Sequence, residues 1–288
     1  MHQSTHMQDT IRHIKESLKG LYPPEEIGSF IRLIFEKVCR YSTIDFILCK
    51  NKTLSPTQHQ QIIAIVKRLQ KYEPIQYILG ETWFYGLRLK TAPGALIPRP
   101  ETEELADLII KRHKNDTGRL VDIGTGSGCL AIALALNMSG IKTEGWDIST
   151  NAIKIAQENA LSSNAPIKFR QVNILEYSPS PDEYGKYDIW VSNPPYVREC
   201  EKNEMKDNVL KYEPYQALFV PDNDPLLFYR KIGTTALDTV KPGGNLYFEI
   251  NANLGNETVN LLAGLGYRNI ELLKDMQQRD RIVSAILP

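Results

Sequence analysis

Cysteine and histidine are both scarce in this chain of 288 residues, and their positions exclude several kinds of chemistry. The four cysteines, Cys39, Cys49, Cys129 and Cys200, lie far apart and form no CxxC pair. This spacing indicates reduced thiols rather than a disulfide framework or a metal cluster. All five histidines fall within the first 113 residues. The rest of the chain therefore has no histidine general base, no Ser-His-Asp triad and no zinc site of its own, which excludes much hydrolase chemistry.

Net charge and long apolar runs are missing as well. Lys plus Arg number 34, as do Asp plus Glu, so the formal net charge is zero. This balance argues against binding nucleic acids or anionic membranes through bulk charge. No segment reaches the length of a membrane span, and the residues after Met1 lack a signal-peptide core. We therefore expect a cytoplasmic protein without a membrane or stable nucleic-acid partner.

The composition is that of an ordinary globular protein, with 42% apolar and 24% charged residues. A chain of 288 residues suggests two domains, or one large domain with an appendage. The first part, residues 8 to about 72, shows helical periodicity and almost no strand signal. Ser55 and Pro56, for example, are an N-cap and a first-turn proline that open a helix. We predict a small helical bundle over residues 1–73, whose solvent face is either purely structural or a surface that docks a partner.

The helical periodicity ends before residue 74, and the pattern of residues 74–98 predicts a linker with a β-hairpin. An alternating stretch from Trp83 to Lys90 is typical of a strand. Pro93-Gly94 then supplies a turn, and residues 95–97 return as a second strand. After the linker, Pro100 and Glu101 mark the first turn of a helix.

From Arg119 onward, strands and helices alternate along the chain. Strands are expected near residues 119–123, 142–146, 167–171, 187–191, 245–250, 270–273 and 281–286, with helices between most of them. This pattern predicts an α/β domain over residues 99–288, built on a doubly wound, mostly parallel sheet with helices on both faces. Ligands of such sheets bind at the carboxyl ends of the strands, where Gly124, Asp147 and Asn193 stand.

A glycine-rich loop follows the first of these strands. Gly124, Gly126 and Gly128 form GxGxG, whereas a dinucleotide loop needs its third glycine where Cys129 stands. A Walker lysine is also missing. Asp147 closes the next strand, where it would accept hydrogen bonds from both hydroxyls of a ribose. The combination predicts a nucleoside cofactor without phosphates, namely S-adenosylmethionine.

We expect the loop residues to contact this cofactor, with Asp122 holding its sulfonium or amino end. These residues are Asp122, Gly124, Thr125, Gly126, Ser127 and Gly128. The alternative is that the glycines only permit tight packing of a helix on a strand. Asn173, after the third strand, would accept from the adenine amino group, or else it only begins a turn.

The stretch Asn193-Pro194-Pro195-Tyr196 follows an apolar strand. Two prolines stop the strand in a stiff, extended turn. The turn presents the Asn193 side-chain oxygen and the Pro194 carbonyl, which together accept both hydrogens of an –NH2 group. Tyr196 would stack on the planar group that carries this nitrogen. The alternative is a proline-stopped strand followed by an asparagine of the turn.

With these motifs, nearly the whole chain resembles the release-factor glutamine N5-methyltransferases. The resemblance rests on residues 74–80, Phe84, 96–103, 122–128, Asp147, 193–196, 212–214, 217–218 and 279–281. The Asn-Pro-Pro-Tyr motif alone is shared with nucleic-acid adenine-N6 methyltransferases. The stretch from Ile97 to Glu103, together with the helical N-terminal domain, is more specific to the glutamine enzymes.

The resemblance implies a seven-stranded class I methyltransferase fold and a monomeric enzyme that uses S-adenosylmethionine. Its substrate would be the Gly-Gly-Gln glutamine of class I peptide chain release factors, docked on the helical domain. Catalytic roles would fall to Asn193, Pro194 and Tyr196, and substrate contacts also to Pro195, Phe84 and Arg99. Asn193 would contact the cofactor too, with Asn173 and Ile174, although the family usually has an acid and a bulky residue there.

The departure at residues 173–175 leaves the adenine contacts open, and a departure at residues 221–225 concerns a local loop. Two rival interpretations also remain open at this stage. One is a nucleic-acid adenine-N6 methyltransferase, and the other is a non-catalytic, cofactor-binding adaptor.

Overall fold

The computed structural model describes residues 6–48 and 52–288, which group into two compact units. One unit is helical and comprises the chain up to Gly80 together with Lys206–Tyr212; the other comprises Glu81–Met205 and Glu213–Pro288. The helical unit reaches beyond the expected boundary at residue 73. Residues 1–5 and 49–51 of the expected helical domain, including Cys49, lie outside the described residues. Within the described chain, no helix is long and apolar enough to span a membrane.

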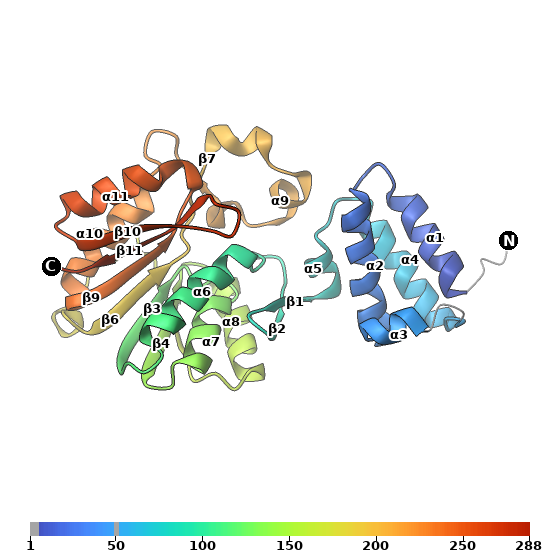
Figure 1. The fold of residues 1–288 in the computed structure, drawn as a ribbon, viewed down its shortest axis with the longest axis horizontal. Coiled ribbons are helices and arrows are strands. Elements are labelled where there is room, and N and C mark those ends of the chain that lie inside the picture. The colour runs from blue at the N-terminus through green and yellow to red at the C-terminus, as the bar shows by residue number, and fades with distance from the viewer. Residues whose placement is uncertain (1–5, 49–51) are drawn as a thin grey trace. The chain divides into compact units, whose positions relative to one another are not determined.

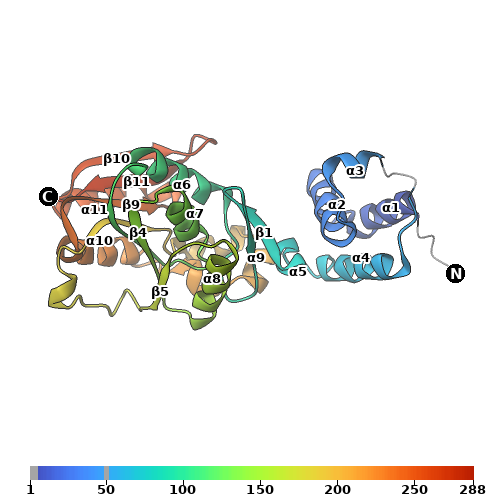
Figure 2. The same cartoon turned by 90° about the horizontal axis from the view of Figure 1, so that it is seen from below.

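The helical unit is a bundle of amphipathic helices around one apolar core (Figures 1 and 2). Its helices are α1 (Met7–Leu18), α2 (Pro24–Cys39), α3 (Thr43–Leu48), α4 (Pro56–Leu69), α5 (Ile75–Leu79) and α9 (Asp207–Tyr212). Ser55 caps α4 in a reciprocal pair with Gln58, as expected from the Ser-Pro signal. The short helices α3, α5 and α9 were not predicted, because five or six residues show no periodicity. The hydroxyl of Tyr212 donates to the Lys71 carbonyl at 2.8 Å, which ties α9 to this unit.

The second unit is built on a seven-stranded sheet in the order β10-β11-β9-β6-β3-β4-β5. Its strands are β3 (Gly118–Ile123), β4 (Ile141–Asp147), β5 (Lys168–Gln171), β6 (Tyr187–Ser192), β9 (Val240–Glu249), β10 (Arg268–Lys274) and β11 (Asp280–Ile286). Within this sheet β11 runs in the direction opposite to the other six strands. The predicted mostly parallel sheet is thus confirmed. The strand order reverses between β3 and β6, and this reversal is where such sheets bind ligands.

Helices cover both faces of this sheet (Figure 1). One face carries α6 (Pro100–His113), α7 (Cys129–Asn137) and α8 (Thr150–Ser162); the other carries α10 (Leu227–Thr239) and α11 (Gly255–Gly264). Neighbouring strand residues alternate between the two cores: Leu120 packs in one and Val121 in the other. Because side chains point to opposite faces in turn, near-continuous apolar strands fill both cores.

Shorter elements complete the unit. They are the strand pair β7 (Val197–Arg198) and β8 (Phe219–Val220), and the short 3-10 helices η1 (Pro181–Glu183), η2 (Glu199–Glu204), η3 (Tyr215–Ala217) and η4 (Ala252–Leu254). The chain between β7 and β8 includes α9.

The hairpin exists, but its predicted turn was wrong. The strands are β1 (Glu81–Phe84) and β2 (Leu87–Lys90), so the turn falls at Tyr85-Gly86 rather than at Pro93-Gly94. Tyr85 and Gly86 have φ of 47° and 74°, which gives a two-residue turn whose twist matches that of the strands. Residues 95–97 form no strand, although Ala95 and Ile97 are buried.

Asn159 on α8 provides a test of how the hairpin and the glycine loop are held. Its side-chain oxygen accepts from the Lys90 N–H at 2.7 Å, and its nitrogen donates to the carbonyls of Lys90 and Ser127 at 3.1 and 2.9 Å. Asn159→Ala leaves these buried backbone groups unpaired, so we expect the free energy of unfolding to fall by about 1–3 kcal/mol. Urea denaturation measures this, with the exposed Gln157→Ala on the same helix as control. Equal stability of the two variants would contradict the assignment.

Candidate active site

The carboxyl ends of β3, β4 and β6 border one cavity of about 490 Å³. Gly124, Asp147 and Asn193, which the sequence placed at strand ends, all line it. Further lining residues are Gly94 to Leu96, Gly126, Ile148, Ser149, Val172 to Leu175, Ser192, Pro194, Pro195 and Pro214 to Ala217. A cavity of this size matches a small-molecule site.

Asp147 faces the cavity with its carboxylate held by the backbone. Oδ2 accepts from the Gly126 N–H and Oδ1 from the Ser149 N–H, both at 2.8 Å. Burial raises the pKa of Asp147, and these backbone hydrogen bonds act in the opposite direction. Each carboxylate oxygen keeps a further lone pair, so the group can accept from the paired hydroxyls of a ribose.

The three loop glycines divide between two roles. Gly124 and Gly126 line the cavity with φ of 74° and 56°, a backbone conformation that favours glycine. Gly128 serves packing instead, because a Cβ there would lie 3.0 Å from the Cβ of Ala156 on α8. Gly128 thus fits the packing interpretation of the GxGxG sequence, and contact of Gly124 and Gly126 with the cofactor stays a prediction.

Asn193 belongs to a chain of side-chain hydrogen bonds. Its Nδ2 donates to Thr102 Oγ1 at 3.1 Å, and the Thr102 hydroxyl donates to Glu249 Oε2 at 2.6 Å. The other oxygen of Glu249, Oε1, accepts from the Tyr196 hydroxyl at 3.1 Å. The Asn193 nitrogen is thus engaged away from the cavity, and its oxygen is the group left for a ligand. From the sequence we expected no catalytic role for Glu249, only that it caps or braces the pocket, and Thr102 was noted only as part of the stretch from Ile97 to Glu103.

Comparisons with known proteins agree with this geometry. Two family models match, the methyltransferase small domain over residues 101–212 and the PrmC N-terminal domain over residues 9–80. A protein of Bacteroides thetaiotaomicron named release factor glutamine methyltransferase is 45% identical over 273 residues, which are 95% of this chain and 97% of the relative. The protein of the same name from Flavobacterium psychrophilum is 43% identical over 93% of this chain and 94% of its own. This chain belongs to the release factor glutamine methyltransferases.

A solved structure of a methyltransferase from Pyrococcus furiosus shares the fold, with a TM-score of 0.51 and 17% identity over 81% of this chain and 98% of its own. The cofactor of this release factor glutamine methyltransferase is S-adenosylmethionine. The site fits the nucleoside part of S-adenosylmethionine, because two kinds of group line the same cavity. One is the Asp147 carboxylate, which accepts hydrogen bonds, and the other is the backbone of Gly124 and Gly126, which has no side chain to block a ligand.

Asp122, Thr125 and Ser127 require a correction, because all three are buried and none lines the cavity. The Thr125 hydroxyl donates to Asp122 Oδ2 at 2.6 Å. Burial raises the pKa of Asp122 to about 7. Asp122 and Thr125 therefore hydrogen-bond to each other, and Ser127 is buried, in place of the side-chain contacts with the cofactor that we expected.

Asn173 and Ile174, which follow β5, also line the cavity. Asn173 Oδ1 accepts from the Leu175 N–H at 3.1 Å, so Asn173 does form the turn that was its alternative role. Ile174 is buried and offers an apolar surface. The hydrogen bond from the adenine amino group to Asn173 stays a prediction.

Of the expected substrate contacts, Pro194 and Pro195 line the cavity, whereas Phe84 does not. The Phe84 side chain is 1% exposed and lies in the core with residues of α6, so its role is structural and a substrate cannot reach it. Arg99 is half-buried and pairs with Glu213 at 2.6 Å, outside the lining. Tyr196 also lies outside the lining, with its hydroxyl on Glu249, and burial raises its pKa. Substrate contacts of Arg99 and Tyr196 stay predictions.

Asp147→Ala tests the cofactor side of the cavity. Removing the carboxylate leaves ribose hydroxyls without a charged acceptor, so we expect S-adenosylmethionine to bind more weakly by about 1–3 kcal/mol. Isothermal calorimetry measures this, and Lys154→Ala, at an exposed position of α8, is the control. Wild-type affinity in Asp147→Ala would remove this residue from the cofactor site.

Proposed function

We propose that this enzyme methylates the side-chain amide nitrogen of the glutamine in the Gly-Gly-Gln motif of class I peptide chain release factors. The observation that carries the proposal is the carboxamide of Asn193, whose nitrogen is engaged by Thr102 while the residue lines the cofactor cavity. The names of relatives that match over more than 90% of the chain support the choice of substrate. We further propose that the protein acts as a monomer in the cytoplasm.

The mechanism follows from the weak nucleophilicity of an amide nitrogen, whose lone pair is delocalised into the carbonyl. When bound, S-adenosylmethionine supplies an electrophilic methyl group. The Asn193 oxygen and the Pro194 carbonyl accept the two N–H groups of the glutamine and hold its nitrogen in line for attack. As the nitrogen becomes positive, its hydrogens become better donors and both hydrogen bonds strengthen. One of these hydrogens then leaves to water as a proton, which gives the neutral methylated amide. The protein thereby stabilises the transition state more than the ground state.

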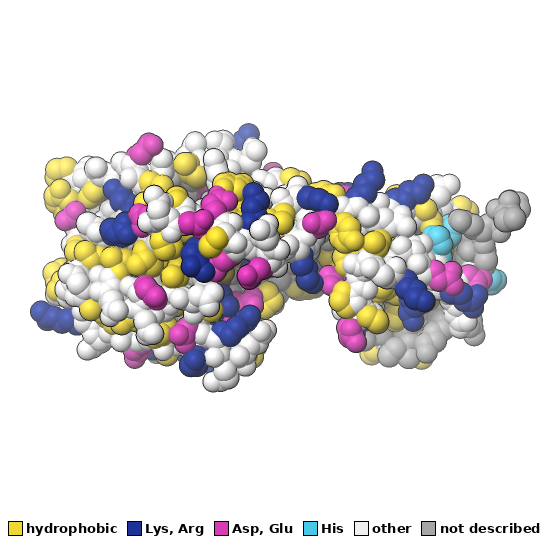
Figure 3. Space-filling view, turned by 90° about the horizontal axis from the view of Figure 1, so that it is seen from above, with side chains coloured by type: hydrophobic (Ala, Val, Ile, Leu, Met, Phe, Trp, Pro, Cys, Tyr) yellow, Lys and Arg dark blue, Asp and Glu magenta, His cyan; other side chains and the backbone are white. Residues whose placement is uncertain are grey.

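An adenine amino group would suit the same acceptors, if the base were flipped out of a helix. Figure 3 shows basic and acidic side chains interspersed on one face, and among the described residues drawn there no continuous basic stripe is visible. A stripe of that kind is what a protein needs to follow a phosphate backbone. The mixed charge and the relatives' names both favour glutamine over adenine.

The direct test is incubation of the enzyme with isotopically labelled S-adenosylmethionine and either purified release factors or total RNA and DNA. Mass spectrometry then maps the labelled residue. We expect label on the glutamine of the Gly-Gly-Gln motif. Labelled adenine without a labelled glutamine would overturn the proposal, and a lack of any label would favour a non-catalytic adaptor.

Asn193→Ala should slow methyl transfer far more than it weakens cofactor binding. Losing one preorganised partner of developing charge typically costs on the order of 100-fold in rate. Asn193→Asp keeps an acceptor but adds a negative charge, and we expect it to be impaired too. Single-turnover rates and calorimetric affinities separate the two effects, and equal losses of rate and affinity would show a structural role.

We also propose that the helical unit docks the release factor. One exposed glutamine cannot distinguish a single protein among thousands, so recognition requires a second surface. The helical unit lies outside the sheet that carries the cavity and matches a separate family model. Deleting it would expose α9, which groups with this unit, so surface substitutions provide a cleaner test than truncation.

Ile44 and Leu48 on α3 are 68% and 76% exposed, one helical turn apart. If the factor docks there, the double variant Ile44→Glu/Leu48→Glu should raise the KM for an intact release factor by about tenfold, since buried apolar anchors dominate such interfaces. A short Gly-Gly-Gln peptide should be unaffected. Leu161→Glu, at an 81% exposed position of α8, is the matched control. An unchanged KM for the intact factor would exclude this face of α3.

A further inference from the structure

The carboxamide of Asn193 can in principle present either of its two ends to the cavity. Its oxygen and its –NH2 group have almost the same size, so shape does not distinguish the two orientations. The proposed chemistry needs the oxygen, because the glutamine nitrogen carries only donors. Some hydrogen-bond partner must therefore select the orientation.

Thr102 is that partner, provided that its own hydroxyl has a defined direction. A hydroxyl has one hydrogen and two lone pairs, so it can either donate to Asn193 or accept from it. The Thr102 hydroxyl lies 2.6 Å from Glu249 Oε2, and a carboxylate can only accept. Its single hydrogen is thus committed to Glu249, and only a lone pair faces Asn193. The contact at 3.1 Å must then be a donation from Asn193 Nδ2.

Glu249 has a hydroxyl donor at each of its two oxygens, an arrangement that suits the ionised carboxylate. It accepts from Thr102 at one oxygen and from Tyr196 at the other. Glu249 is only 1% exposed, and this burial raises the pKa of its carboxyl group. The two hydroxyls and the charge of Arg281 oppose this effect, whereas Glu101 on α6 adds to it. Thr102, Tyr196 and Arg281 thus favour the ionised form of Glu249 and act against the effect of its burial.

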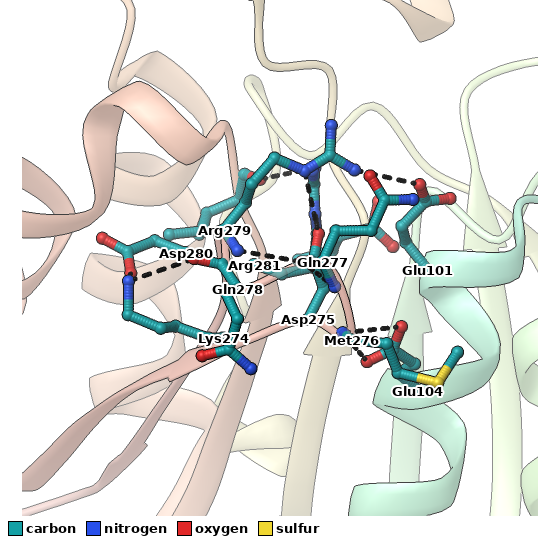
Figure 4. A network of polar contacts seen from close by, with 12 residues as sticks. Glu101, Glu104, Lys274, Asp275, Met276, Gln277, Gln278, Arg279, Asp280 and Arg281 are labelled. Carbon is teal, nitrogen blue, oxygen red and sulfur yellow. Dashed lines mark hydrogen bonds and ion pairs between the residues drawn. The ribbon is translucent and has the colours of Figure 1, made fainter.

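Further contacts hold in place the elements that carry Thr102, Glu249 and Arg281. Arg281 is buried and donates from Nη1 to the Ile250 carbonyl at 3.2 Å, directly after β9 and Glu249. Its Nε lies 3.4 Å from Asp275 Oδ2, in the turn between β10 and β11 (Figure 4). The same turn contacts α6, where the Met276 N–H donates to Glu104 Oε2 at 3.2 Å. The helix that carries Thr102 is therefore tied to the strands that carry Glu249 and Arg281.

We propose that Thr102 and Glu249 are positioning residues that fix the orientation of the Asn193 carboxamide, so that its oxygen faces the amide of the substrate. The inference rests on the proposed function and adds two residues to it. Neither residue lines the cavity. They act through Asn193, and Glu249 also anchors Tyr196 of the same motif.

Three variants separate this role from simple packing. Thr102→Val keeps the shape but removes the hydroxyl, so the carboxamide is free to rotate and present its –NH2 group. Thr102→Ser keeps the hydroxyl. Thr143→Val is the matched control, because Thr143 is a buried threonine of β4 whose hydroxyl has no partner in the described structure.

With a Gly-Gly-Gln peptide and S-adenosylmethionine, we expect Thr102→Val to lower kcat by roughly ten- to hundredfold at unchanged cofactor affinity. Thr102→Ser should recover most of this loss, and Thr143→Val should behave as the wild type. Glu249→Gln should also lower kcat, because an amide partner no longer commits the threonine hydrogen. In an Asn193→Ala background, Thr102→Val should cause little further loss, since it acts through Asn193.

Full activity of Thr102→Val would overturn the inference, and so would losses that multiply with those of Asn193→Ala. A parallel loss of cofactor affinity and melting temperature would assign Thr102 to the structure alone. These outcomes are distinct from a failure of the proposed function, which would appear as an unmodified glutamine with the wild-type enzyme. The inference can therefore fail while the proposed function stands.

Discussion

One buried carboxylate, that of Glu249, connects the parts of the catalytic unit that must come together. An ion removed from water is stable only if the protein replaces its hydration with hydrogen bonds and an opposite charge. Here the hydrogen bonds come from Thr102 on α6 and from Tyr196 after β6, and the charge comes from Arg281 on β11. Because these groups satisfy the ion, they also fix the geometry around Asn193. The contacts that compensate the buried charge of Glu249 are therefore the same contacts that orient the Asn193 carboxamide.

The carboxyl groups near the cavity differ in their roles because their hydrogen-bond partners differ. Burial raises the pKa of Asp122, Asp147 and Glu249 alike, but their partners differ. Asp147 reaches the cavity and keeps lone pairs for a ligand, while Asp122 lies beneath the glycine loop and receives the Thr125 hydroxyl. Glu249 lies behind Asn193 and acts on it through Thr102. The proposed contacts with the cofactor and with the substrate therefore depend on two separate carboxylates. Asp147 ends β4, and Glu249 ends β9.

Two kinds of feature could be predicted from the sequence. The first is secondary structure, which follows from local pattern, and the second is the set of residues at strand ends, which meet at one edge of the sheet. Alternation of strands and helices gave the doubly wound sheet, and the turns after β3, β4 and β6 brought Gly124, Asp147 and Asn193 to one cavity. The hairpin turn was misplaced because the positive φ of Tyr85 has no compositional signal. Phe84 was assigned to the substrate because a motif does not reveal that α6 buries it. The contact between Thr102 and Glu249 joins residues 147 positions apart, and only tertiary structure shows such a pair.

We propose that the protein presents the oxygen of Asn193, oriented through Thr102, to the amide nitrogen of a glutamine. Neutron diffraction of the enzyme with S-adenosylhomocysteine and a Gly-Gly-Gln peptide can decide this, because the method locates amide and hydroxyl hydrogens. We expect the glutamine nitrogen about 3 Å from Asn193 Oδ1, with the Asn193 –NH2 group on Thr102 and the Thr102 hydrogen on Glu249. An Asn193 –NH2 group turned toward the glutamine, or a Thr102 hydrogen pointing at Asn193, would contradict it.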